Sequence, residues 1–322
     1  MCKNIKSMNI LLMMASLIIS SCGSSSTSGI DDEGQKDIPS VLIDSTGYKP
    51  TPKFAAVPDY DSYQLVWHDE FDTDGLPGKE WVYEQGFVRN NELQWYQDKN
   101  AKVTSGCLEI EGRREQVSNP NYDANSSDWK LQRKYAEYTS SSLTTQNSFA
   151  FRFGRMEVRA KIPTASGSWP AIWLLGDKWG WPNNGEIDIL EYYIKNGRPS
   201  ILANACWGDK GLWQAVWNES VTPFSHFTNK DKDWNHKFHI WRMDWDENFM
   251  SIYVDDELLN KIDLKDTYNK GYDDNYENPF TSEQIKHYIL LNLAIGGNGG
   301  TPDVSAFPLK YQVDYVRVYQ KK

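Results

Sequence analysis

The chain has 322 residues and a formal net charge of −10, with 34 Lys and Arg against 44 Asp and Glu. An acidic chain without basic runs is a poor candidate for nucleic-acid binding, so we expect no such partner. Five scattered histidines and the lack of a C-x-x-C pair argue against a transition-metal site. The 14 Trp and 18 Tyr are many for a chain with 39% hydrophobic residues, and such rings suit surfaces that stack on sugars. Composition therefore favours a carbohydrate ligand.

The N-terminal segment is typical of a bacterial secretion signal. Lys3 and Lys6 precede the apolar run NILLMMASLII, which is too short to span a membrane as a stable helix. The run continues into ISSC, which resembles a lipobox and implies cleavage before Cys22 and lipidation of its thiol. An ordinary secretory signal with a chance cysteine is the alternative. We expect a signal peptide at 1–21 and an anchor at the outer membrane or cell surface, with a periplasm-facing position also open.

The next segment, 22–60, is rich in Ser, Gly, Asp and Pro and lacks periodicity, which predicts a flexible tether. The lipid would be the only contact with the membrane.

Residues 61–322 read as strands and loops of one domain. GRMEVRAKI alternates, with Met156, Val158, Ala160 and Ile162 on one side of a strand and charged residues on the other. FHIWRMDW, MSIYVDDELL, HYILLNLAI and YQVDYVRVYQ are further β-branched and aromatic runs bounded by turn residues. So many amphipathic strands predict an all-β, two-sheet sandwich, and we expect a monomer.

Two cysteines lie inside this domain, Cys107 and Cys206. A disulfide between them is conceivable in an oxidising compartment, but the sequence does not give their separation. Two buried free thiols are the preferred interpretation.

The stretch NGEIDILEYY places Glu186, Asp188 and Glu191 within six positions. Side chains alternate along a strand, so Glu186 and Asp188 share a face and Glu191 points away. A β-bulge at Ile189–Leu190 restores the phase and brings all three acids to one side, with Ile187 and one bulge residue facing the core.

Three like charges on one face repel, and this arrangement suits retaining glycoside hydrolysis. One carboxylate attacks the anomeric carbon, and the other protonates the leaving oxygen and then activates water. Asp188 between them can hydrogen-bond the nucleophile, and mutual repulsion raises the pKa of the group that stays protonated. A calcium cluster and a solvated acidic edge strand are the competing interpretations.

The flanking sequence resembles glycoside hydrolase family 16, in its bulge-containing, laminarinase-like branch. GEIDILEYY matches the E-x-D-x-x-E signature, and GSWPAIWLLG matches the segment just upstream. NNELQWY, YTSSSLTT, FGRMEVRAKI, LLNLAIGG and VDYVRVYQ match further blocks in the same order, over roughly residues 62–320. The resemblance implies a β-jelly-roll with an open concave cleft for a polysaccharide, and a catalytic domain at 61–322.

The resemblance also assigns roles to individual residues. Glu186 matches the nucleophile, Asp188 the assisting acid and Glu191 the acid/base. The resemblance implies that Trp169, Trp173, Asn91 and Glu92 bind substrate, and the strand after the acids, which departs from the family pattern, adds Asn204 and Trp207 as expected substrate-binding residues. Asp314 matches a ligand of a structural calcium ion found in many relatives, with a surface-capping Asp as the alternative. No cofactor is expected for catalysis.

Departures from the family pattern bear on the substrate. The strand after the acids, within ILANACWGDKGLWQAVW, has no His where laminarin-specific relatives usually carry one, and GGNGG lacks a Trp. The sequence slightly favours an endo-acting retaining β-glycanase acting on β-1,3- or mixed-linkage β-glucan. The alternatives are an endo-β-1,4-galactosidase acting on mucin-type O-glycans or another galactan, and a non-catalytic glycan-binding lipoprotein.

Overall fold

The computed structural model describes residues 60–210, 213–270 and 277–322. The expected signal peptide, Cys22 and all of the tether before residue 60 lie outside these ranges. No helix among the described residues is long and apolar enough to cross a membrane.

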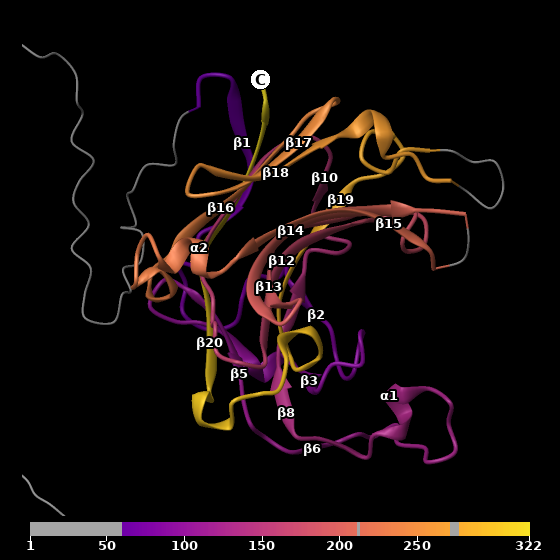
Figure 1. Cartoon of the computed structure of the whole chain (residues 1–322), viewed down its shortest axis with the longest axis vertical. Helices are drawn as coiled ribbons and strands as arrows, with labels where there is room; N and C mark the ends of the chain where they lie inside the picture. The colour runs from indigo at the N-terminus through magenta and orange to yellow at the C-terminus, as the bar shows by residue number, and fades with distance from the viewer. Residues whose placement is uncertain (1–59, 211–212, 271–276) are drawn as a thin grey trace, which may run out of the picture. The chain divides into compact units, whose positions relative to one another are not determined.

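Two large antiparallel sheets form the domain (Figure 1). We call them the outer sheet and the cleft sheet. The outer sheet contains, in spatial order, β18 (Glu257–Asp263), β17 (Phe249–Val254), β16 (His239–Trp245), β11 (Gly154–Lys161), β20 (Leu309–Lys321), β5 (Leu108–Gly112) and β4 (Ala101–Val103), with β1 (Tyr63–Asp69) also paired to β20. The cleft sheet contains β15 (Ala215–Pro223), β14 (Arg198–Gly208), β13 (Glu186–Lys195), β12 (Ser168–Gly176), β19 (His287–Ile295), β9 (Ser142–Thr144) and β2 (Val82–Tyr83), with β10 (Ala150–Phe151) also paired to β19.

The remaining elements are short. Two small sheets pair β3 (Gln94–Tyr96) with β8 (Tyr138–Ser140) and β6 (Val117–Ser118) with β7 (Tyr135–Ala136). The helical turns are α1 (Trp129–Gln132), α2 (Ser225–Thr228), η1 (Asp98–Asn100), η2 (Trp234–His236), η3 (Leu264–Asp266), η4 (Gly297–Gly299) and η5 (Val304–Ala306).

The hydrophobic core lies between the two sheets, because one buried cluster contains residues of both. The alternation predicted for β11 is confirmed: Met156, Val158 and Ala160 are buried in this cluster. Arg155 and Arg159, on the other side of the strand, form ion pairs with Asp244 and Asp314. The all-β, two-sheet prediction is therefore confirmed.

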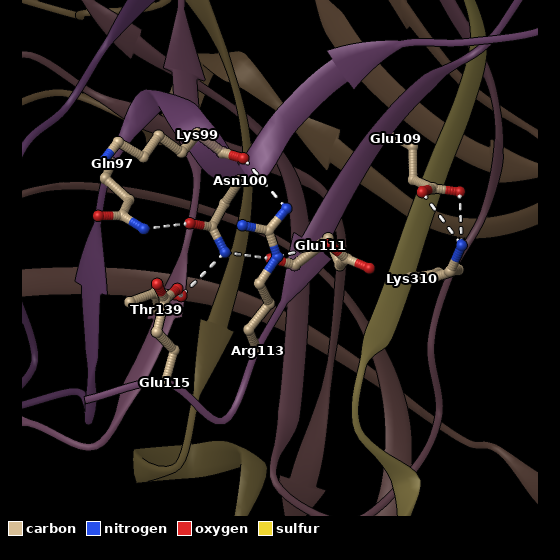
Figure 2. A network of polar contacts seen from close by, with 9 residues as sticks. All are labelled: Gln97, Lys99, Asn100, Glu109, Glu111, Arg113, Glu115, Thr139 and Lys310. Carbon is tan, nitrogen blue, oxygen red and sulfur yellow. Dashed lines mark hydrogen bonds and ion pairs between the residues drawn. The ribbon is translucent and has the colours of Figure 1, made fainter. Parts of the chain in front are cut away.

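A polar network fixes the edge of the outer sheet where β4 and β5 meet β8 (Figure 2). Asn100 Nδ2 donates to the Glu111 carbonyl at 2.6 Å and to Thr139 Oγ1 at 3.0 Å. Its own Oδ1 accepts from Gln97 Nε2 at 2.7 Å. Because Asn100 is buried and its amide groups are paired, it links three segments at little desolvation cost.

Cys107 and Cys206 are both buried and both free. The preferred interpretation of two buried thiols is thus confirmed, and burial raises the pKa of each thiol.

Candidate active site

The bulge predicted in β13 is present. Asp188 lies opposite Asn204 of β14, and Glu191 lies opposite Leu202. Ile189 and Leu190 therefore face a single residue, Ala203, and the extra residue restores the phase of the strand. Both bulge residues are fully buried in the core, where the sequence predicted that only one would be.

The bulge brings the three acids to one wall of a cleft of about 850 Å³. The cleft runs over the cleft sheet, with β12, β13, β14, β15 and β19 contributing to it. Its lining residues are Arg89, Asn90, Glu92, Trp169, Ala171, Trp173, Leu175, Trp181, Glu186, Asp188, Glu191, Tyr193, Lys195, Asn204, Trp213, Trp217, Glu219, Asn292 and Asn298. Aromatic and carboxylate groups dominate this surface, as a carbohydrate site requires.

Glu191 is held by two neighbouring strands. Trp169 Nε1 of β12 donates to Glu191 Oε1 at 2.9 Å, and Asn204 Nδ2 of β14 lies 3.4 Å from Glu191 Oε2. Burial raises the pKa of Glu191 to about 7, and the charge of Glu186 adds to this rise, while the bond from Trp169 opposes it. A carboxyl group with such a pKa can carry a proton near neutral pH and donate it, as an acid catalyst must.

Glu186 and Asp188 share a different environment. Trp181 Nε1 donates to Glu186 Oε2 at 2.6 Å. Burial raises the pKa of both groups, and for Asp188 the charges of Glu191 and Glu186 raise it well above its usual range.

Asp188 is only 1% exposed, and its Oδ2 receives no N–H donor among the described residues. Glu186 and Asn204 are the hydrogen-bonding neighbours of Asp188, and two carboxyl groups can bond only when one carries a proton. Burial and the charges of Glu191 and Glu186 raise the pKa of Asp188, which favours its protonated form. The site can thus supply Glu186 as the nucleophilic carboxylate and Glu191 as the proton donor.

Most of the predicted substrate-binding residues lie at the cleft, but two do not. Trp169, Trp173, Glu92 and Asn204 line it. Asn91 does not; its backbone carbonyl and its side-chain oxygen accept bonds from Arg133, while the preceding Asn90 lines the cleft.

The prediction for Trp207 is wrong. Trp207 is buried in the core together with Ala203 and Ala205, and its ring packs edge-on against Phe280. The reason is the two-residue period of β14: Asn204 faces the cleft, so a residue three positions later faces the core.

Sequence reasoning missed several residues of the site, among them Arg89, Trp181 and Asn292. Trp181 lies five residues before Glu186, and Asn292 is a polar residue inside the apolar run HYILLNLAI. The amide in that run was an available signal, because a buried polar side chain requires a partner. Asn292 accepts a bond from Trp173 Nε1 at 2.7 Å and donates to the Tyr96 hydroxyl at 3.0 Å.

The calcium prediction for Asp314 stays a prediction. Asp314 is buried, and its Oδ2 accepts a hydrogen bond from Arg159 at 2.5 Å, so a cation already neutralises it. Across 60–210, 213–270 and 277–322, no group of three or more His, Cys, Asp or Glu side chains is arranged to hold a metal ion.

Comparisons with known proteins agree with this geometry. The model of glycosyl hydrolases family 16 matches residues 92–298, which is more than half of the chain. The chain is 33% identical over 278 residues to a glucan endo-1,3-β-glucosidase A1 of Niallia circulans, which covers 80% of this chain and 38% of that protein. It is 32% identical over 275 residues to a β-glucanase of Rhodothermus marinus, which covers 80% of this chain and 85% of that protein.

A solved structure gives a similar result. It comes from work on endo-acting O-glycanases with which prominent members of the human gut microbiota initiate mucin breakdown. It superimposes with a TM-score of 0.71 at 36% identity, covering 81% of this chain and 92% of that one. The chain thus spans well under half of the Niallia circulans protein and most of the other two.

Proposed function

The chain belongs to glycosyl hydrolase family 16, and from that premise we propose that it is an endo-acting, retaining β-glycanase that needs no catalytic cofactor. The observation that carries the proposal is the bulged strand β13. It presents Glu186, Asp188 and Glu191 together on the wall of one cleft. The rival function, a glycan-binding protein without activity, gives no reason to gather three carboxyl groups on one wall of the cleft.

The reaction follows from the two carboxyl environments. The Glu186 carboxylate attacks the anomeric carbon while Glu191 passes its proton to the glycosidic oxygen, and the leaving sugar departs with that proton. Water then attacks the glycosyl ester, Glu191 takes up a proton from the water, and Glu186 is released as a carboxylate. Asp188 and Trp181 donate to Glu186 and stabilise its charged form in the free enzyme.

For the substrate, we propose a β-1,3- or mixed-linkage β-glucan. The named glucanases among the relatives support this class. The second candidate is a β-1,4-galactoside chain of mucin-type O-glycans. It is favoured by the similarity to the O-glycanase structure and by the lack of a His in β14, where residues 201–207 read ILANACW.

A reducing-sugar assay on a panel of polysaccharides tests both candidates. The panel contains laminarin, a mixed-linkage β-glucan, an agarose-type galactan and mucin O-glycans, and Glu186→Ala is the inactive control. We expect oligosaccharides from one class only, with internal bonds cut first. Binding without release of reducing ends from any member would instead support the glycan-binding alternative.

We further propose that Cys22 carries a lipid and that the protein sits at the outer membrane or cell surface as a monomer. Lys3 and Lys6, the apolar run that follows them and the ISSC sequence ending at Cys22 support this proposal.

A further inference from the structure

Trp181, which donates its indole N–H to the Glu186 carboxylate, belongs to the loop that joins β12 to β13. A backbone bond closes a tight turn around it, because the Asn184 N–H donates to the Gly180 carbonyl at 3.1 Å. Trp181 and Asn183 both lie inside this turn. A contact that fixes the backbone of Asn183 therefore also fixes the backbone from which the Trp181 ring extends.

A residue distant in the sequence makes such a contact. Asn269 follows η3 and is 3% exposed, and its Nδ2 donates to the Asn183 carbonyl at 2.7 Å. The same turn is also linked to the end of β12, where Asn184 Nδ2 donates to the Gly176 carbonyl at 3.2 Å. The bond from Asn269 is the shorter of the two, and it joins the turn to a different part of the domain.

The other half of the Asn269 amide binds the end of β14. Its Oδ1 accepts from the Gly208 N–H at 2.7 Å, and the next residue, Lys270, donates its N–H to the Gly208 carbonyl at 3.1 Å. A Cβ atom at position 208 would lie 1.7 Å from Asn183 Oδ1, so a side chain there would push Asn183 away. Asn269 thus uses both a donor and an acceptor of its buried amide to link the turn to β14.

We propose that Asn269 is a positioning residue for the nucleophile. It links the turn that carries Trp181 to the end of β14, and so keeps the Trp181 indole N–H on the Glu186 carboxylate. The inference rests on the proposed function, because it takes Glu186 as the attacking group. Asn269 is not among the residues lining the cleft, so its effect passes through Trp181. A nucleophile held in line with the anomeric carbon reacts faster than one that moves.

The test is a double-variant cycle, with kcat and KM measured on a soluble polysaccharide that the wild type cuts. Trp181→Phe keeps an aromatic ring and removes the donor, so kcat should fall about tenfold, the effect of one hydrogen bond to a charged group. Asn269→Ala should lower kcat about three- to tenfold and change KM less than about twofold, because it removes no group from the cleft. Combined with Trp181→Phe, Asn269→Ala should lower kcat by no more than about twofold further, because the bond that Asn269 maintains is already absent.

Asn278→Ala is the matched control. Asn278 is a buried asparagine of the same stretch of chain, 4% exposed, and it donates to the Leu264 carbonyl at 2.6 Å and accepts from the Phe280 N–H at 2.9 Å. Its loss should lower the temperature of thermal unfolding and leave kcat at the wild-type value.

Asn269→Asp is a second variant, and it keeps the proposal testable if Asn269→Ala does not fold. It retains the acceptor for the Gly208 N–H and loses only the donor to the Asn183 carbonyl, so it should show the same loss of kcat as Asn269→Ala.

Two results would overturn the proposal. If the losses from Trp181→Phe and Asn269→Ala multiplied in the double variant, Asn269 would not act through Trp181. If Asn278→Ala lowered kcat as much as Asn269→Ala does, the effect would be one of general stability. A wild-type enzyme inactive on every glycan would instead reject the proposed function itself, a result distinct from either.

Discussion

Trp169 of β12 donates its indole N–H to Glu191 of β13, at 2.9 Å. This bond favours the charged form of Glu191 and lowers its pKa against the rise that burial causes. Trp169→Phe keeps the ring and removes the donor, so the pKa of Glu191 should rise further. Because Glu191 must be protonated to act as the acid, the basic limb of kcat/KM should move to higher pH. A pH–rate profile measures this shift.

The acid limb serves as the internal control for Trp169→Phe, because it reports Glu186. It should remain in place. A basic limb that stays fixed or moves to lower pH would show that Glu191 does not set it.

The two glutamates should respond differently to azide. Glu186→Ala should abolish turnover because no covalent intermediate can form, whereas Glu191→Ala should lose about 10²–10⁴-fold, and less with a good leaving group. In Glu186→Ala, azide can enter the vacated space and attack an activated β-glycoside to give the α-glycosyl azide. In Glu191→Ala it meets the covalent intermediate from the opposite face and gives the β-glycosyl azide. NMR of the products distinguishes the two, and exchanged products would exchange the assigned roles.

Deleting Leu190 should remove the bulge and put Glu191 two positions after Asp188. The acids could still converge, because two residues apart on a regular strand share a face. We expect a loss of about 10²-fold or more, since a misplacement of ~1 Å costs that much, and Leu190 also leaves the core. Thermal unfolding checks that the variant is folded before its activity is measured. Wild-type rates in a folded variant would mean that the bulge has no catalytic importance.

The features that could be predicted from the sequence are those that follow from the local periodicity of a strand. The odd offset of Glu191 called for the bulge, and the alternation around Met156 and Val158 gave the core face of β11, because both follow from the two-residue period of a strand. The same rule, applied to β14, would have placed Trp207 in the core.

Contacts between distant segments were beyond such reasoning. The Arg89–Trp173 contact joins a loop after β2 to the middle of β12, and Asn292 of β19 binds Trp173 across a strand pair. Nothing in the spacing of these residues signals that they meet. The ion pair of Arg159 with Asp314 likewise depends on β11 and β20 being neighbours, which strand patterns alone do not reveal.

Cys22→Ser should release the protein from membranes and leave its specific activity unchanged, because residues between 22 and the domain would separate the lipid from the cleft. Metabolic labelling with a palmitate analogue, followed by membrane fractionation, measures both effects. Label that persists in the variant would place the anchor at another residue.

The β15 end of the cleft should bind the polymer through exposed tryptophans. Trp213 is 65% exposed and Trp217 is 45% exposed, and both line the cleft. Trp213 also stacks on Trp181, with ring centroids 6.3 Å apart.

Stacking of an aromatic ring contributes ~0.5–1.5 kcal/mol, so Trp213→Ala or Trp217→Ala should raise KM for a polysaccharide roughly two- to tenfold. In Trp217→Ala, a short aryl glycoside that occupies only the other side of Glu186 and Glu191 should be cut at the wild-type rate. Trp179→Ala is the matched control, because Trp179 is also exposed, at 37%, but is not among the residues lining the cleft. Equal effects of all three variants on the polysaccharide, or an equal loss on the aryl glycoside, would show that this end of the cleft is not a separate sugar-binding surface.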